Sequence, residues 1–141
     1  MIRERAFAEL SPDELYAILR LRAEVFVVEQ ECAYLDLDGR DREPSARHLW
    51  VAAGDQPVAA YLRVLDDGEA RRIGRVVTHP SARSGGLAGR LIEYVLATTG
   101  GPWVLDAQSH LAGWYGRFGF EVCGDEYLED GIPHTPMRRP A

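Results

Sequence analysis

The sequence has no excess of basic residues. Its 22 acidic and 16 basic side chains give a formal net charge of −6 at pH 7. Nonspecific binding to nucleic acid requires a basic surface that displaces counterions from the phosphates, so this balance argues against a nucleic-acid-binding protein. Long apolar runs are also missing, because no segment approaches the ~20 residues that a membrane-spanning helix needs. We therefore expect neither nucleic acid nor a membrane among its partners.

Cysteine is scarce as well. The two cysteines, Cys32 and Cys123, form no metal-ligand pattern. We expect both to be small, reduced core residues, and we predict no bound metal. The first residues, Met1 to Arg5, lack the apolar region of a signal peptide. Together these absences predict a cytoplasmic protein.

The remaining composition is typical of a globular domain. The chain has 141 residues, of which 46% are hydrophobic and 27% are charged. A chain of this size can bury a substantial core within one domain. It contains no repeat, low-complexity segment or linker, so we expect a single domain over residues 1–141.

The most informative stretch reads as a strand, a glycine-rich loop and a helix in succession. The segment Ile73–Thr78 is rich in β-branched residues and contains Gly74, which predicts a strand with a bulge or a close backbone approach. His79-Pro80-Ser81 ends this strand, and the loop Arg83–Gly89 follows it. Apolar residues then recur at helical spacing at Leu87, Leu91 and Val95. Unpaired N–H groups at a helix start, without Cβ atoms in front of them, suit a pyrophosphate group.

Other interpretations compete with a pyrophosphate loop. The loop lacks the Gly-Lys-Ser or Gly-Lys-Thr of a Walker motif, and the chain has no Gly-x-Gly-x-x-Gly. A turn that only begins a helix remains an alternative. A calcium loop around Gly39 is rejected, because Tyr34 and Ser45 would occupy its first and twelfth positions, which require carboxylates.

Turn residues and periodicity define the remaining elements. Ser11 and Glu14 form a capping box around Pro12, at the start of a helix predicted to reach Val27 or Val28. The strand–helix–strand order from Ile73 onward requires a parallel strand pair. The other expected elements are strands over 2–7, 48–53, 58–65, 103–107 and 120–123, a short helix over 108–118, a polar loop over 126–133 and a final edge strand over 134–139.

Several segments in this order resemble the GNAT acetyltransferase superfamily. Arg83-Ser84-Gly85-Gly86-Leu87-Ala88 matches its R/Q-x-x-G-x-G/A signature, and Tyr115–Phe120 is similar to its Y-x-x-x-G-F segment. The resemblance extends along nearly the whole chain. Further segments resemble the ElaA-like branch of that superfamily: residues 22–30, 34–39, 46–49, 107–111 and 129–134.

This resemblance implies an α/β fold and a cofactor. The fold would be a mixed, twisted, mostly antiparallel sheet of about six to seven strands with helices on both faces. Its central parallel pair, 73–78 with 103–107, would splay apart to hold acetyl-CoA, and a strand N–H near Val77 would polarise the thioester carbonyl. The implied cofactor-binding residues are Val76, Val77, Thr78, Arg83, Ser84, Gly85, Gly86, Leu87, Ala88, Gly89, Arg90 and Gln108.

The resemblance also implies direct acetyl transfer to a primary amine of a small molecule or peptide. Tyr115 occupies the motif position of the general acid, and a phenol with a pKa of ~10 is protonated at neutral pH. Its alternative role is that of a core aromatic. Many relatives have a glutamate base in the central strand, but residues 72–75 contain no carboxylate. The base therefore stays open among Glu29, His48, His110 and His134.

The acceptor site is the least defined part of this interpretation. Acidic residues would recruit a cationic acceptor, whereas Arg63 and Arg75 would bind an acidic group on it or act as cross-strand charge partners. A CoA-binding sensor without turnover, and an acyltransferase that uses another acyl group or acceptor, remain alternatives. A homodimer through the C-terminal strands is compatible with the sequence. The expected acceptor-site residues are Phe26, Glu29, Tyr34, Asp38, His48, Arg63, Arg75 and His134.

Overall fold

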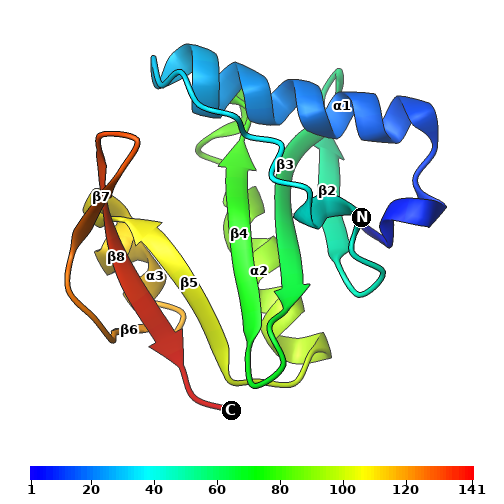
Figure 1. The fold of residues 1–141 in the computed structure, drawn as a ribbon. Coiled ribbons are helices and arrows are strands. Elements are labelled where there is room, and N and C mark those ends of the chain that lie inside the picture. The colour runs from blue at the N-terminus through cyan, green and yellow to red at the C-terminus, as the bar shows by residue number, and fades with distance from the viewer.

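The computed structural model describes all residues from Met1 to Ala141 and contains an eight-stranded sheet (Figure 1). The strand order is β1-β2-β3-β4-β5-β8-β6, and β7 pairs with β8. Every pair is antiparallel except β4 with β5, which confirms the predicted mixed, mostly antiparallel sheet. The strands are β1 (Ile2–Arg5), β2 (Arg47–Ala53), β3 (Gln56–Asp66), β4 (Arg71–Thr78), β5 (Trp103–Gln108), β6 (Glu121–Val122), β7 (Tyr127–Glu129) and β8 (Ile132–Arg139).

The first helix begins with the capping box that the sequence predicts. The Ser11 hydroxyl accepts a hydrogen bond from the Glu14 N–H, and the Glu14 carboxylate accepts one from the Ser11 N–H. Helix α1 (Pro12–Arg22) continues as a π-helical segment (Ala23–Glu29). The other helices are α2 (Leu87–Thr98) and α3 (Ala112–Gly116), with short 3₁₀ turns at Phe7–Glu9, Arg40–Arg42, Pro80–Ala82 and Ser109–Leu111.

Helices cover both faces of the sheet. On one face, α1 and the π-helical segment pack Ile18, Leu21 and Val25 against the strands. On the other face, α2 contributes Leu91, Ile92 and Val95 to the larger core cluster. Strand β3 lies between these layers and is buried over residues 58–65, as expected for a strand covered on both sides. None of the helices has the length and apolar character needed to cross a membrane.

Strands β4 and β5 separate soon after they meet. They pair only at Arg71 with Trp103 and at Arg72 with Val104, and Figure 1 shows them diverging beyond this point. Strand β4 also contains the predicted bulge, because Tyr61 pairs with Val77 whereas Arg63 pairs with Gly74. Three steps along β4 therefore oppose two along β3. The sheet is open between β4 and β5 beyond Arg72, which confirms the predicted splay of this strand pair.

The C-terminal region differs from the prediction. The expected polar loop 126–133 contains β7 and the start of β8, joined through Asp130 and Gly131, whose φ angles are +51° and +79°. Two successive positive φ angles are typical of a tight hairpin turn. Strand β8 is not an edge strand, because β5 lies on one side of it and β6 and β7 lie on the other.

Pro136 is tolerated within this internal strand for a local reason. Its carbonyl accepts a hydrogen bond from the Cys123 N–H at 2.9 Å, so its nitrogen also faces the outer side of β8. On that side Pro136 falls between the residues paired with β7, 132–134, and those paired with β6, 137–138. The missing N–H therefore leaves both ladders intact.

The expected helix 108–118 is shorter in the structure. Gln108 ends β5, a 3₁₀ turn covers Ser109–Leu111, and only Ala112–Gly116 are α-helical. Tyr115 belongs to the larger core cluster, and Trp114 and Phe118 pack against it. The apolar spacing that predicted a longer helix therefore reflects core packing. The helical pattern was therefore correct for its second half and wrong for its first.

Candidate active site

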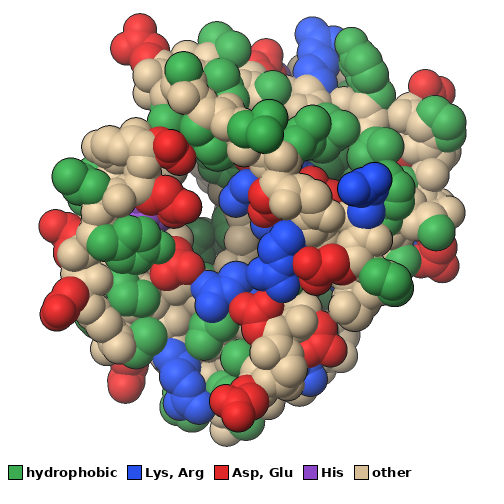
Figure 2. All heavy atoms as spheres, in the orientation of Figure 1, with side chains coloured by type: hydrophobic (Ala, Val, Ile, Leu, Met, Phe, Trp, Pro, Cys, Tyr) green, Lys and Arg blue, Asp and Glu red, His purple; other side chains and the backbone are tan.

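A cavity of about 980 Å³ opens between the diverging strands. Figure 2 shows this hollow, with acidic and basic side chains gathered at its rim. The lining comes from the π-helical segment, the loop after it, β3, β4, β5, α3 and the β7–β8 hairpin. Segments far apart in the sequence thus meet at the point where the sheet is open.

One wall of the cavity is the free edge of β4. Val76, Val77 and Thr78, the strand residues expected to bind the cofactor, all line the cavity. Beyond Arg72 this edge has no partner from β5, so backbone groups that face it are available to a ligand. An extended amide-containing ligand could complete the ladder there in place of a strand.

The glycine-rich loop ends at a helix start with free donors. Gly86 is the N-cap of α2 and has a φ of +70°, a conformation that a residue with a Cβ rarely adopts. The N–H groups of Gly86, Leu87, Ala88 and Gly89 have no backbone acceptor. Free donors at the positive end of a helix dipole meet the requirements of an anion cradle. Of the predicted loop residues, Arg83 and Ala88 line the cavity, whereas Ser84, Gly85, Gly86, Leu87, Gly89 and Arg90 do not.

Arg83 and Glu29 are each other's partners. The Arg83 guanidinium donates to both carboxylate oxygens of Glu29, from Nη1 to Oε2 at 2.8 Å and from Nη2 to Oε1. Its Nε donates to the Thr78 carbonyl at 3.1 Å. Hydrogen bonds from Arg83 hold the pKa of Glu29 below its usual range. A carboxylate with a lowered pKa is a weaker proton acceptor, which reduces the case for Glu29 as the base.

Tyr115 both packs in the core and reaches the cavity. It is only 6% exposed, and its ring lies edge-on to Trp114 and Phe120 with centroids 4.9 and 6.3 Å away. It nevertheless belongs to the cavity lining. Burial raises the pKa of its hydroxyl, so the phenol keeps its proton at neutral pH. The two roles expected of this residue are therefore compatible.

Asp38 is held by arginines. Its carboxylate accepts from Arg63 Nη1 and Nη2 at 2.9 and 2.8 Å, and from Arg75 Nη2 at 3.3 Å. Burial opposes ionisation, but these bonds and the Arg40 N–H hold the pKa of Asp38 well below its usual range. Because its negative charge is already neutralised, Asp38 is poorly suited to recruit a cationic acceptor. Arg63 and Arg75 are likewise charge partners of this loop, which was the alternative expected for them.

His48 does not line the cavity. It is 1% exposed, and its Nδ1 and Nε2 lie 2.7 Å from the Tyr61 hydroxyl and 2.9 Å from the Asp41 carbonyl. Burial lowers its pKa. With both ring nitrogens engaged within the protein, His48 cannot contact an acceptor directly, which corrects the expectation for this residue. Its sequence position on a strand gave no indication of the face it occupies.

His134 and His110 both line the cavity. The His134 Nδ1 lies 2.8 Å from the Ile132 carbonyl, and its ring stacks on Tyr127 with centroids 5.8 Å apart. A carbonyl can only accept, so Nδ1 carries the proton, and in the neutral ring Nε2 is left as the acceptor nitrogen. His134 thus has the tautomer that a base requires.

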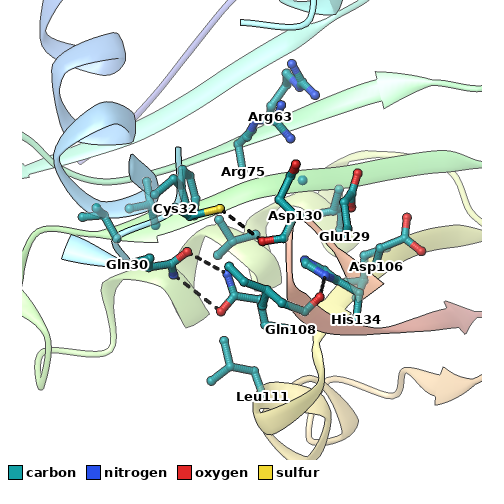
Figure 3. A pocket seen from close by; sticks show the side chains of 18 of the residues that line it. Gln30, Cys32, Arg63, Arg75, Asp106, Gln108, Leu111, Glu129, Asp130 and His134 are labelled. Atoms are coloured by element: carbon teal, nitrogen blue, oxygen red, sulfur yellow. Dashed lines mark hydrogen bonds between the residues drawn. The ribbon is translucent and has the colours of Figure 1, made fainter. Parts of the chain in front are cut away.

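Three polar contacts are drawn between walls of the cavity in Figure 3. Gln108 Nε2 donates to Gln30 Oε1 at 3.2 Å, Gln30 Nε2 donates to Gln108 Oε1 at 3.5 Å, and Cys32 Sγ lies 3.6 Å from the Asp130 carbonyl. They join the segment after the first helix to β5 and to the β7–β8 hairpin. Cys32 is buried, as expected of a core cysteine, whereas Cys123 is exposed, which corrects the expectation for that residue. Of the remaining predicted acceptor-site residues, Phe26 and Tyr34 also line the cavity. The Tyr34 hydroxyl donates to Asp36 Oδ1 at 2.8 Å.

The sequence analysis missed several lining residues. Gln30, Glu129 and Asp130 lie within segments that carry the ElaA-like resemblance, and this was the available signal. Each arginine of the lining has a carboxylate partner within 4.0 Å, but Glu129 and Asp130 have no basic partner. The charges that remain uncommitted at the cavity are therefore negative. No group of three or more His, Cys, Asp or Glu side chains is placed to hold a metal ion.

Comparisons with known proteins agree with this architecture. Residues 12–140 match the acetyltransferase (GNAT) domain family. The chain is 46% identical over 137 residues to UPF0039 protein Rv2851c of Mycobacterium tuberculosis, covering 94% of this chain and 88% of that protein. It is 42% identical over 140 residues to protein ElaA of Escherichia coli, covering 94% and 91%. The crystal structure of an acyl-CoA N-acyltransferase from Pseudomonas aeruginosa superposes with a TM-score of 0.90 at 42% identity, covering 99% of both chains.

The family match spans most of the chain, and the relatives are similar over most of their own length. The splayed parallel pair and the donor-rich helix start occur in the part of the chain that the family match covers. The chain therefore belongs to the GNAT acetyltransferase family and to its ElaA-like branch.

Proposed function

We propose that this chain is an acetyl-CoA-dependent N-acetyltransferase that transfers the acetyl group directly to a primary amine of a small molecule or peptide. The observation that carries the proposal is the cavity between β4 and β5, bordered by a helix start whose N–H groups have no acceptor. The family membership supports acyl transfer, and the P. aeruginosa neighbour is described as an acyl-CoA N-acyltransferase. Acetyl as the acyl group is our specific proposal.

The free donors fit the cofactor at two places. The N–H groups from Gly86 to Gly89 would hold the diphosphate, with charge from Arg90, or from Arg83 once it exchanges Glu29 for the diphosphate. The free edge of β4 at Val76–Thr78 and the Gln108 carboxamide would contact the amide-rich arm. When bound, acetyl-CoA supplies an acyl group activated as a thioester. A strand N–H near Val77 would polarise its carbonyl.

The remaining chemistry requires two proton transfers. The amine must lose a proton before attack, and the departing thiolate must gain one. Tyr115 is the proposed acid, because its buried phenol stays protonated and lines the cavity. His134 is the proposed base, because its Nδ1–H is bound to the Ile132 carbonyl and Nε2 is free to accept.

The free charges of the cavity favour a cationic acceptor. The lining arginines are paired, whereas Glu129 and Asp130 have no cationic partner. An amine that carries a second positive charge would find its complement on the β7–β8 hairpin.

From the sequence alone we also propose a cytoplasmic location and a homodimer that forms through the C-terminal strands.

The deciding experiment is a panel of amines incubated with the protein and acetyl-CoA, with free thiol and acetylated product both measured. All 16 basic residues of the chain are arginine, so no lysine of the enzyme competes as an acceptor. We expect thiol release and product with at least one amine. Binding of CoA without turnover on any amine would favour the sensor alternative. Faster turnover with a different acyl-CoA would reassign the donor.

A further inference from the structure

Arg75 occupies a backbone conformation that arginine does not favour. Its φ is +53°, at the bulge of β4, where glycine would avoid the clash of a Cβ with the backbone. The preceding residue, Gly74, has no positive φ, and a Cβ built there would meet no atom within 4 Å. The glycine therefore stands beside the strained position and not at it. A side chain kept at such a position at the cost of backbone strain indicates that the side chain has a task.

The Arg75 side chain binds the loop that follows the first helix. Its Nη2 donates to the Asp36 carbonyl at 2.9 Å and lies 3.3 Å from Asp38 Oδ2. Its Nε lies 2.8 Å from Asp36 Oδ1. The contacts reach from β4 to a segment 37 and 39 positions earlier in the chain. Arg75 thus ties this loop to the bulge.

The same loop is also bound by Arg22, the last residue of α1. Arg22 is 0% exposed, and its Nε donates to Asp36 Oδ2 at 2.8 Å. Tyr34 donates to the other oxygen of the same carboxylate. Figure 3 shows Arg75 next to Arg63, which binds Asp38 from β3. Arg75 is therefore the β4 contact of a network that fixes the whole loop.

This loop and this strand form different walls of the cavity. Gln30, Cys32, Tyr34 and Leu35 line the cavity from the loop, and β4 lines it from the proposed cofactor side. The distance between the two walls sets the distance between an acceptor and a thioester. Reaction rates are highly sensitive to this distance, because a misplacement of 1 Å can cost ~100-fold.

We propose that Arg75 is a positioning residue, which ties the loop 30–38 to the β4 bulge and so fixes the acceptor wall relative to the cofactor strand. This inference rests on the proposed acyl transfer but adds a role that the reaction itself does not specify. Arg75 is not proposed to touch either substrate. Its effect is predicted to appear in acceptor use and in the mobility of the loop.

Two substitutions separate the side chain from the backbone. Arg75→Gly removes the tie but accepts a φ of +53° without strain, so the bulge is retained. Arg75→Ala also removes the tie but keeps the Cβ, so the strain at φ +53° remains without the contacts that hold the bulge in place. Arg47→Gly is the matched control, because Arg47 is an ion-paired arginine on β2, bound to Glu4 at 3.0 Å, and lies outside the cavity lining.

For Arg75→Gly we expect kcat/KM for the amine to fall by about 10- to 100-fold, with KM for acetyl-CoA within about twofold of wild type. Arg75→Ala should also raise KM for acetyl-CoA, and Arg47→Gly should change neither. Hydrogen exchange should accelerate in residues 30–38 of Arg75→Gly at a temperature where the protein stays folded.

An amine kcat/KM within twofold of wild type in Arg75→Gly would overturn the proposal. So would an equal loss toward both substrates, because that pattern would place the effect in the bulge itself. If the wild-type protein binds acetyl-CoA but transfers nothing, the proposed function fails. Hydrogen exchange then decides the role of Arg75 alone, and unchanged exchange in residues 30–38 would exclude the tie.

Discussion

Tyr115 illustrates how a single side chain can serve the core and the cavity together. Its ring packs edge-on against two aromatic neighbours, and the same burial keeps its hydroxyl protonated. The sequence predicted both roles for this position but could not show that they coexist. The two roles are compatible, because the ring fills the core cluster while the residue also borders the cavity.

Replacing Tyr115 by phenylalanine should therefore affect chemistry and spare the fold. Tyr115→Phe keeps the ring and removes only the proton, so kcat and kcat/KM should fall together by about 10², the lower end for general acid catalysis. The affinity for CoA should change little. Tyr94→Phe is the control, because Tyr94 lies on α2 outside the cavity lining. Steady-state rates within twofold of wild type in Tyr115→Phe would leave Tyr115 as a core aromatic only.

Residue partners were the part of the site that sequence could not predict. Asp38 and His48 have the chemistry of acceptor-site residues, but the fold pairs Asp38 with Arg63 and buries His48 against Tyr61. The contact of His48 with Tyr61 depends on the register of β2 and β3, and the contact of Asp38 with Arg63 depends on how the loop after the first helix packs on β3. Sequence periodicity defines neither of them closely. Residue type predicted what these groups can do, and tertiary contacts determined what they are free to do.

At the scale of elements, the loop before α2 and the helix that follows it were predictable from the local sequence alone. Its glycines and the apolar repeat after it follow from local backbone chemistry, so no distant contact was needed to expect a helix start there. The β7–β8 hairpin shows the opposite case. Asp130-Gly131 is a hairpin turn signal, but β7 has only three residues and β8 contains Pro133 and Pro136, which weaken the strand pattern.

A glutamate at Gly86 should block the proposed diphosphate cradle. Gly86→Glu places a Cβ at a φ of +70° and a negative charge among the free N–H groups. Gly54→Glu is a close control, because Gly54 has a φ of +58° in the β2–β3 turn and also has no neighbour within 4 Å. Both variants should lose about 1 kcal/mol of stability from strain. Only Gly86→Glu should weaken CoA binding strongly in calorimetry. Equal affinities in the two variants would show that the diphosphate does not bind at the start of α2.

The β7–β8 hairpin should determine acceptor affinity. Glu129→Gln removes one of the two uncommitted carboxylates without changing its size. We expect KM for a cationic amine to rise several-fold, about 1 kcal/mol of binding, with KM for acetyl-CoA unchanged. Glu121→Gln on β6, which lies outside the lining, should change neither constant. A Glu129→Gln variant with unaltered amine KM would assign acceptor binding to another wall.

At the scale of the whole molecule, the fold contains two apolar core clusters and one buried network of charged side chains. Apolar periodicity predicted most of the individual strands and helices, and the resemblance to the GNAT superfamily implied how they are arranged in one sheet. The prediction gave six to seven strands and the structure has eight, because the three-residue strand β7 lies in the segment that was expected to be a polar loop. The network that links Arg22, Asp36, Asp41, Arg63 and Asp38 joins three separate chain segments, and no local pattern encodes it.

This network should make stability depend on pH in one direction. The pKa values of Asp38 and Asp41 lie below their usual range in the folded protein, because bonds from Arg63 and Arg22 outweigh the opposing effect of burial. A carboxyl group with a depressed folded-state pKa stabilises the fold above its unfolded pKa of about 3.9. That contribution is lost as the pH falls from there through the folded-state pKa. Acidification below about pH 4 should therefore reduce the free energy of unfolding.

The contribution of Asp38 can be isolated by measuring urea unfolding from pH 7 down to about pH 3. Asp38→Asn should be less stable than wild type near neutral pH, because Arg63 and Arg75 lose a charged partner. The difference should shrink below about pH 4, because Asp38 then binds a proton in the unfolded wild-type chain while it stays ionised in the folded one, and the Asn variant has no such group. Asp125→Asn is the control, since Asp125 is exposed and has no ion pair, and its difference from wild type should stay small at every pH. A constant difference between wild type and Asp38→Asn across this range would mean that the ionised carboxylate adds no stability, and that Asp38 acts only through its shape and neutral hydrogen bonds.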